Sequence, residues 1–84
     1  MEQSISHVFH PIKLASINSK PGRIIASVED AARTLLTKWP GDEGERFYEA
    51  VKACLDCLHQ LAEPAFVRLA FVRAAQDAGI IIEH

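Results

Sequence analysis

Long apolar segments are what this sequence of 84 residues most plainly lacks. Its apolar runs, such as Ile80-Ile81-Ile82, are far too short to cross a bilayer, which takes roughly 20 residues of helix. The first residues, Met1-Glu2-Gln3-Ser4, have neither the basic start nor the apolar run of a signal peptide. We therefore expect a cytoplasmic protein that does not insert into a membrane.

Concentrated positive charge is missing as well. The chain has 9 basic and 11 acidic side chains, a net charge of −2, and no basic stripe. Proteins that bind nucleic acids by neutralising phosphates need such a stripe, so we expect no nucleic-acid partner. The only two cysteines, Cys54 and Cys57, are too close in sequence for the disulfide framework of a secreted domain.

What the sequence does contain is apolar material. Hydrophobic residues make up 49% of the chain, which is enough for a core and too much for a disordered segment. A chain of this length buries roughly 60–65% of its unfolded surface. We expect one domain over residues 1–84, with residues 1–7 as a loose lead-in.

The clearest helical pattern runs from Asp42 to Leu61. Apolar residues recur there at steps of four, three, four and three, at Phe47, Val51, Cys54, Leu58 and Leu61. Polar residues recur at steps of four, three, four and four on the opposite side, at Glu45, Glu49, Lys52, Asp56 and Gln60. This split predicts a half-buried helix, capped by Asp42, around which the rest of the chain packs.

Two further helices flank it. Ser27 has the position of an N-cap with Asp30 three residues on, and the apolar stripe that follows is Val28, Ala31, Ala32, Leu35, Leu36 and Trp39. Pro40 ends this helix. The third helix is expected over Pro64–Ala78, with a core face of Val67, Ala70, Phe71, Ala74 and Ala78. Gly79 fits the left-handed position that closes a helix.

Three short segments have strand character. Val8 to Ile17 and Arg23 to Ala26 predict a hairpin around the turn Lys20-Pro21-Gly22-Arg23, with His10, Ile12 and Leu14 on one side. Ile80-Ile81-Ile82 predicts a last, buried strand that joins the hairpin. The order β-β-α-α-α-β indicates an α+β fold, with a sheet of about three strands and three helices on one face.

Several stretches together carry a family resemblance: Ser27-Val28-Glu29-Asp30-Ala31-Ala32, Leu35-Leu36-Thr37-Lys38-Trp39-Pro40, Tyr48-Glu49-Ala50, Ala53-Cys54-Leu55, Ala70-Phe71-Val72-Arg73-Ala74-Ala75 and Ala78-Gly79-Ile80. Over about residues 11–82 the chain resembles the domain-of-unknown-function 982 family, small bacterial proteins found mostly in alphaproteobacteria. The resemblance implies an α+β protein of the bacterial cytoplasm. It implies no activity, substrate or catalytic residue.

The cysteine pair is the sharpest candidate for chemistry. A C-x-x-C motif is redox-active at a helix N-terminus, but Cys54 and Cys57 lie three turns inside the expected helix. They could form a Cys2His2 zinc site if the first strand brought His7 and His10 across this helix. The alternative interpretation, in which both cysteines are core residues, fits the apolar stripe better.

Evidence for catalysis is otherwise absent from the sequence. None of the four histidines stands in a local pattern with a nucleophile and a carboxylate. The carboxylate row of Glu45, Glu49 and Asp56 is interpreted as a solvated helix face. We nominate no catalytic residue, cofactor or metal, although a small enzyme whose site forms only in space stays a third hypothesis.

The third helix is apolar nearly all round. With Val67 and Phe71 inward, Leu69 and Val72 point the other way beside Arg68, a combination typical of subunit contacts. Trp39 most simply closes the core, and alternatively anchors an interface. Our leading hypothesis is a non-enzymatic module that binds a second copy of itself or another protein, with a metal or thiol site at Cys54 and Cys57 as the alternative.

Overall fold

The computed structural model describes residues 7–15, 22–37, 39 and 43–83. Along the chain it contains six elements: β1 (Val8–Leu14), β2 (Arg23–Ser27), α1 (Val28–Thr37), α2 (Glu45–Leu58), α3 (Pro64–Asp77) and β3 (Ile82–Glu83). The three expected helices and the α+β class are confirmed. In the described part of the chain, no helix is both long and apolar enough to cross a membrane.

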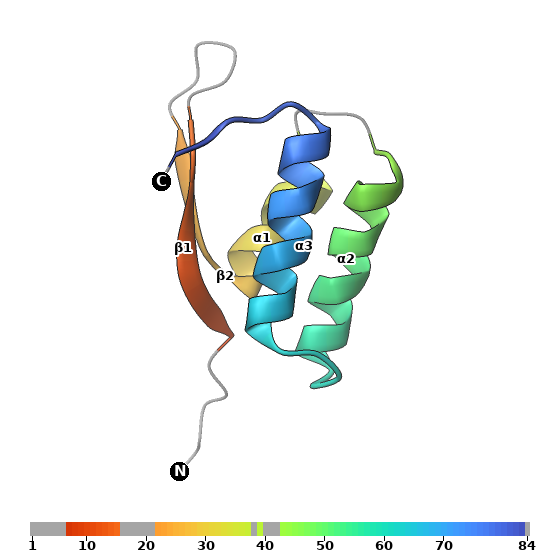
Figure 1. The fold of residues 1–84 in the computed structure, drawn as a ribbon. Helices are drawn as coiled ribbons and strands as arrows, with labels where there is room; N and C mark the ends of the chain where they lie inside the picture. Colours follow the sequence, from red (N-terminus) through yellow and green to blue (C-terminus); the bar gives the residue numbers. More distant parts are fainter. Residues whose placement is uncertain (1–6, 16–21, 38, 40–42, 84) are drawn as a thin grey trace.

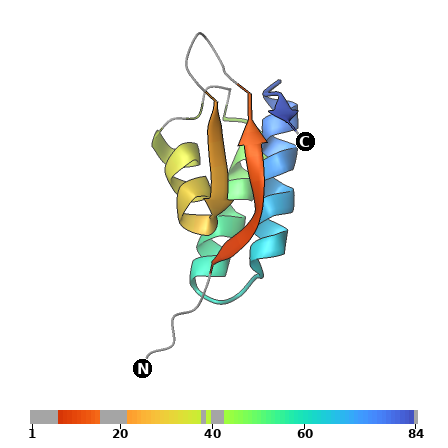
Figure 2. The same cartoon turned by 90° about the vertical axis from the view of Figure 1, so that its left-hand side faces the viewer.

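The helices lie on one face of the sheet, in two tiers. Figure 1 shows α1 and α3 next to the strands and α2 on the far side of them, and Figure 2 shows the same order with the sheet in front. The contacts agree, because α3 touches β1, β3, α1 and α2, whereas α2 packs chiefly on α1 and α3. The expectation that the 42–61 helix is the centre of the fold was wrong: α3 holds that position.

The main part of the sheet is an antiparallel pair, β1 and β2, in which Ile12 lies opposite Ile25. Both side chains are buried. An irregularity in β1 between Val8 and Ile12 shifts the alternation of side chains. Phe9 therefore packs against the core and His10 is exposed, which corrects the expectation that His10 shares a side with Ile12.

The expected strand at Ile80–Ile82 is reduced to two residues, Ile82 and Glu83, which pair with the end of β1. The reason lies in how α3 ends. Gly79 adopts a left-handed φ of 78° as predicted, and the N–H of Ile80 donates to the carbonyl of Ala75 at 2.8 Å. This Schellman closure holds Ile80 at the helix end, where it fills the core instead of starting a strand.

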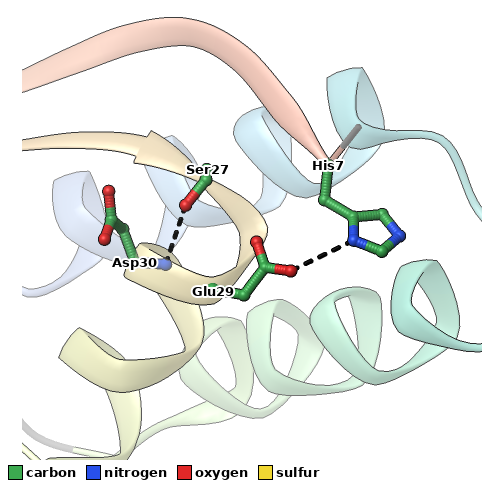
Figure 3. A network of polar contacts seen from close by, with 4 residues as sticks. All are labelled: His7, Ser27, Glu29 and Asp30. Carbon is green, nitrogen blue, oxygen red and sulfur yellow. Dashed lines mark hydrogen bonds and ion pairs between the residues drawn. The ribbon is translucent and has the colours of Figure 1, made fainter. Parts of the chain in front are cut away.

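The start of α1 follows the capping prediction. The hydroxyl of Ser27 accepts a hydrogen bond from the N–H of Asp30 at 3.1 Å (Figure 3). The Asp30 carboxylate accepts in turn from the N–H of Ala26 at 3.4 Å. In a capping box the donor would be the N–H of Ser27, one residue later. The start of the second helix differs from expectation, because α2 begins at Glu45 after Gly44 and the proposed cap Asp42 lies outside the described residues.

The hairpin turn is described only at its end, since Lys20 and Pro21 lie outside the described residues. Gly22 is close to the opposite strand, and a Cβ atom at this position would overlap the carbonyl oxygen of Leu14. Glycine is therefore required here for a close approach of two backbones.

The inner face of α1 is rotated from the expected stripe. Leu36 is exposed, and Thr34 is buried in its place. The Thr34 hydroxyl is satisfied, because it donates to the carbonyl of Asp30 at 2.9 Å and accepts from the Arg23 guanidinium at 3.2 Å. A buried threonine with two partners costs little, so α1 can turn this face to β2.

The inner face of α2 is rotated as well. Its buried residues are Phe47, Ala50, Ala53, Cys54 and Cys57, all but the first of them small. Leu58 and Leu61, which the expected stripe placed in the core, are exposed. Small side chains let α2 approach α1 and α3 closely, and Tyr48, Leu55 and Leu58 of α2 are left outside.

Three aromatic rings close the core between the helices. Trp39 contacts Phe47 at a centroid distance of 5.8 Å and Phe71 at 5.6 Å, the latter edge to face. Its indole N–H is buried and has no partner among the described residues. The expectation that Trp39 closes the core against the long helix is confirmed, although Trp39 lies beyond the end of α1 at Thr37.

Two phenylalanines on α3 test this core. Phe71 is 0% exposed and Phe66 is 54% exposed. We expect Phe71→Ala to lower the free energy of unfolding in urea by about 3–5 kcal/mol, because it removes a buried ring and leaves a cavity. The matched Phe66→Ala change should cost less than about 1 kcal/mol. Equal losses would contradict the packing described.

Candidate functional site

A second apolar stripe runs along the outside of α2. Its members recur at steps of three, four and three: Tyr48, Val51, Leu55 and Leu58. Val51 is partly buried against the core, and the other three side chains are exposed. Because α2 is the helix farthest from the sheet (Figure 1), the exposed side chains of this stripe lie on the outer part of the helical layer.

The apolar exposure continues through the α2–α3 turn. Leu61 in the turn and Phe66 and Leu69 on α3 are exposed. The two helices are antiparallel neighbours, so residues next to the turn share one end of the pair (Figure 1). We define the hairpin surface by its exposed large apolar residues: Tyr48, Leu55, Leu58, Leu61, Phe66 and Leu69.

The interface residues predicted from the sequence have different positions in the fold. Leu69 is exposed on the hairpin surface, whereas Val72 is partly buried against the core. The Arg68 guanidinium Nε–H donates to the carbonyl of His10 at 2.7 Å and so ties α3 to β1. Trp39 belongs to the aromatic cluster of the core. Of the four, Leu69 alone belongs to the hairpin surface.

Two ion pairs lie on the exposed surface of α2. Lys52 Nζ lies 2.9 Å from Asp56, and Arg46 lies 3.2 Å from Glu49. These ion pairs are at the surface, where each contributes little to stability. The expected solvated carboxylate row is therefore present, with Asp56 its least exposed member.

Both cysteines are buried on the inner face of α2 and are free thiols. Burial raises the pKa of the Cys54 thiol from 9.0 to about 11, with a smaller contribution from Cys57. Burial also raises the pKa of the Cys57 thiol, and the negative charge of Glu29 adds to this effect. Nucleophilic and metal-binding cysteines need the thiolate, so the surroundings of this pair oppose both uses.

One histidine of the proposed metal set does come close to a carboxylate. His7 Nδ1 and Glu29 Oε2 lie 3.1 Å apart (Figure 3), and the N–H of Val28 donates to the His7 carbonyl at 2.8 Å. These contacts join the start of β1 to the start of α1. His10, by contrast, is exposed. Among the described residues, no three His, Cys, Asp or Glu side chains are grouped closely enough to hold a metal ion.

The sequence contains a signal for the outer stripe of α2 and none for the contact between His7 and Glu29. The outer stripe of α2 has helical spacing, but two of its members, Val51 and Leu58, were included in the expected core stripe. The contact between His7 and Glu29 joins residues 22 positions apart and follows no short motif.

Comparison with known proteins gives one match. A family model described as "Protein of unknown function (DUF982)" covers residues 10–82, nearly the whole chain, and confirms the resemblance noted in the sequence. No curated protein and no solved structure matches the chain.

The buried thiols predict a pH dependence. Between about pH 9 and pH 11 the unfolded chain loses the Cys54 proton while the folded chain retains it, so stability falls as the pH rises through this range. One such group changes the free energy of unfolding by up to about 1.4 kcal/mol per pH unit. We expect urea unfolding of Cys54→Ala to show a shallower decline over this range than the parent protein. Identical slopes would contradict a thiol held protonated by burial.

Proposed function

The chain belongs to the DUF982 family, whose description assigns no activity, and we propose that it acts as a protein-binding module through its hairpin surface. The observation that carries the proposal is the exposure of six large apolar side chains on two adjacent helices and their turn. Several large apolar side chains exposed on neighbouring elements are typical of subunit and partner contacts, whereas single exposed leucines are ordinary.

The composition of the surface supports the proposal. Tyr48 and Phe66 are aromatic, and aromatic residues are enriched where proteins bind one another. The ion pair of Lys52 with Asp56 borders the apolar stripe. An apolar centre with a charged border is the usual anatomy of an interface.

The side chains best suited to catalysis or metal binding have structural roles in this fold. Cys54 and Cys57 are small side chains that let α2 pack closely, and burial keeps them protonated. Arg68 and Glu29 each bond to β1 or its start. These engagements favour binding over catalysis and leave the metal or thiol alternative without support.

We further propose that the protein works in the bacterial cytoplasm. The chain has only two cysteines, one helical turn apart, and these cannot build the disulfide framework typical of small secreted domains.

Site-specific photo-crosslinking in the source cells tests the binding function. A photoreactive phenylalanine analogue placed at Leu55 or at Phe66 should give a discrete adduct with a protein, because both positions belong to the hairpin surface. The same analogue at Arg33, an exposed residue of α1 outside this surface, should give none. The measurement is the mass of the adduct after purification under denaturing conditions.

An adduct with a second copy or with another protein would both support the function. The proposal would be overturned by the absence of any adduct from positions 55 and 66, or by the same smear of products from all three positions.

A further inference from the structure

We infer that the partner of α2 is α2 of a second copy, packed antiparallel about a two-fold axis. This inference rests on the proposed function and names its partner. Its basis is the spacing of Tyr48, Val51, Leu55 and Leu58. Their steps of three, four and three are those of successive a and d positions, the core positions of a coiled coil. Helix α2 is the outermost helix of the molecule (Figure 1), and Tyr48, Leu55 and Leu58 are exposed on it, so a second helix can approach them.

The stripe is complementary to itself when reversed. With the axis at the height of position 53, Tyr48 of one copy lies level with Leu58 of the other, and Val51 lies level with Leu55. Each layer then contains one larger and one smaller or branched side chain, which is the arrangement that fills a seam without voids. An isologous contact of this kind closes a dimer and leaves no surface for further growth.

Charge on the solvent side of the stripe also fits this arrangement. Glu45 of one copy comes within about two residue heights, roughly 3 Å along the axis, of His59 of the other. At the centre, Lys52 meets its own copy across the axis. Each lysine is already paired with Asp56 of its own copy at 2.9 Å, so a carboxylate accompanies each of the two like charges. Antiparallel packing also sets the positive end of each helix dipole against the negative end of the other.

The edges of the sheet and the outer side of α3 are less suited to a second copy. Pro11 has no N–H to donate, and the Arg68 side chain occupies the His10 carbonyl, so the outer edge of β1 is a poor template for another strand. At the opposite edge, α1 extends beside β2 (Figure 2). The exposed side of α3 is mixed, because it carries Arg73, Gln76 and Asp77 as well as Phe66 and Leu69.

The size of the contact sets the conditions of the experiment. Helix α2 has 14 residues and is therefore about 21 Å long. One helix pair of this length falls at the low end of interface sizes, where complexes are weak. Sedimentation should accordingly cover about 1 to 1,000 μM protein and should give a monomer–dimer equilibrium within this range.

A matched pair of variants tests the position of the interface. Leu55 is 51% exposed and Leu69 is 48% exposed, so aspartate is introduced at two leucines of nearly equal exposure. Leu55→Asp should raise the dimer dissociation constant at least about 30-fold, as expected for a central contact. Leu69→Asp should change it less than threefold. Circular dichroism checks that both variants are folded.

Position 52 tests the two-fold axis itself. In the inferred dimer, Lys52 meets Lys52 of the second copy, so Lys52→Glu brings two glutamates together and weakens its own dimer. Mixed with the parent protein, it pairs a glutamate with a lysine. Native mass spectrometry of the mixture, with the variant ¹⁵N-labelled, should give more heterodimer than the statistical half. The variant Arg33→Glu, on α1, should give the statistical mixture.

The outcomes separate this inference from the proposed function. A monomer throughout the concentration range, or a dimer weakened equally by changes at Leu55 and Leu69, would overturn the α2 pairing. A statistical mixture for Lys52→Glu would overturn the two-fold axis at this position. If position 55 still crosslinks to a different protein in cells, the binding function stands although the self-pairing fails.

Discussion

The fold depends on the close approach of α2 to α1 and α3, which small side chains permit. Ala50, Ala53, Cys54 and Cys57 form most of the inner face of α2, and Phe47 closes it at one end against Trp39. Because the inner face is used for alanine and cysteine, the tyrosine and leucines of the same helix face outward. The core and the exposed stripe are thus two consequences of one packing choice.

The same choice accounts for the chemical state of the cysteines. Thiols placed at a helix–helix contact lose water, and their pKa values rise. A C-x-x-C motif that suggests redox or metal chemistry in sequence is therefore a packing element here. The contact of His7 with Glu29 likewise joins the first strand to the first helix, and the hydrogen bond from Arg68 to His10 joins that strand to α3.

Much of this architecture could be predicted from the sequence. The spacing of apolar residues indicates the three helices, Ser27 marks the start of α1, and Gly79 marks the end of α3. The last strand could not be predicted, since the closure of α3 engages the N–H of Ile80 and leaves only a two-residue pairing. The buried face of α2 was assigned to leucine rather than alanine because single-sequence patterns weigh size, whereas helix packing here favours small residues. Of the candidate site, Leu69 was anticipated and the stripe containing Leu55 was not.

The central claim is that another chain covers the outer stripe of α2. Paramagnetic relaxation of leucine methyl groups by a soluble probe, measured at low and high protein concentration, tests it most directly. The account predicts that Leu55 and Leu58 become protected as the concentration rises, while Leu36, exposed on α1, stays accessible throughout. Equal accessibility of all three leucines at every concentration would contradict it.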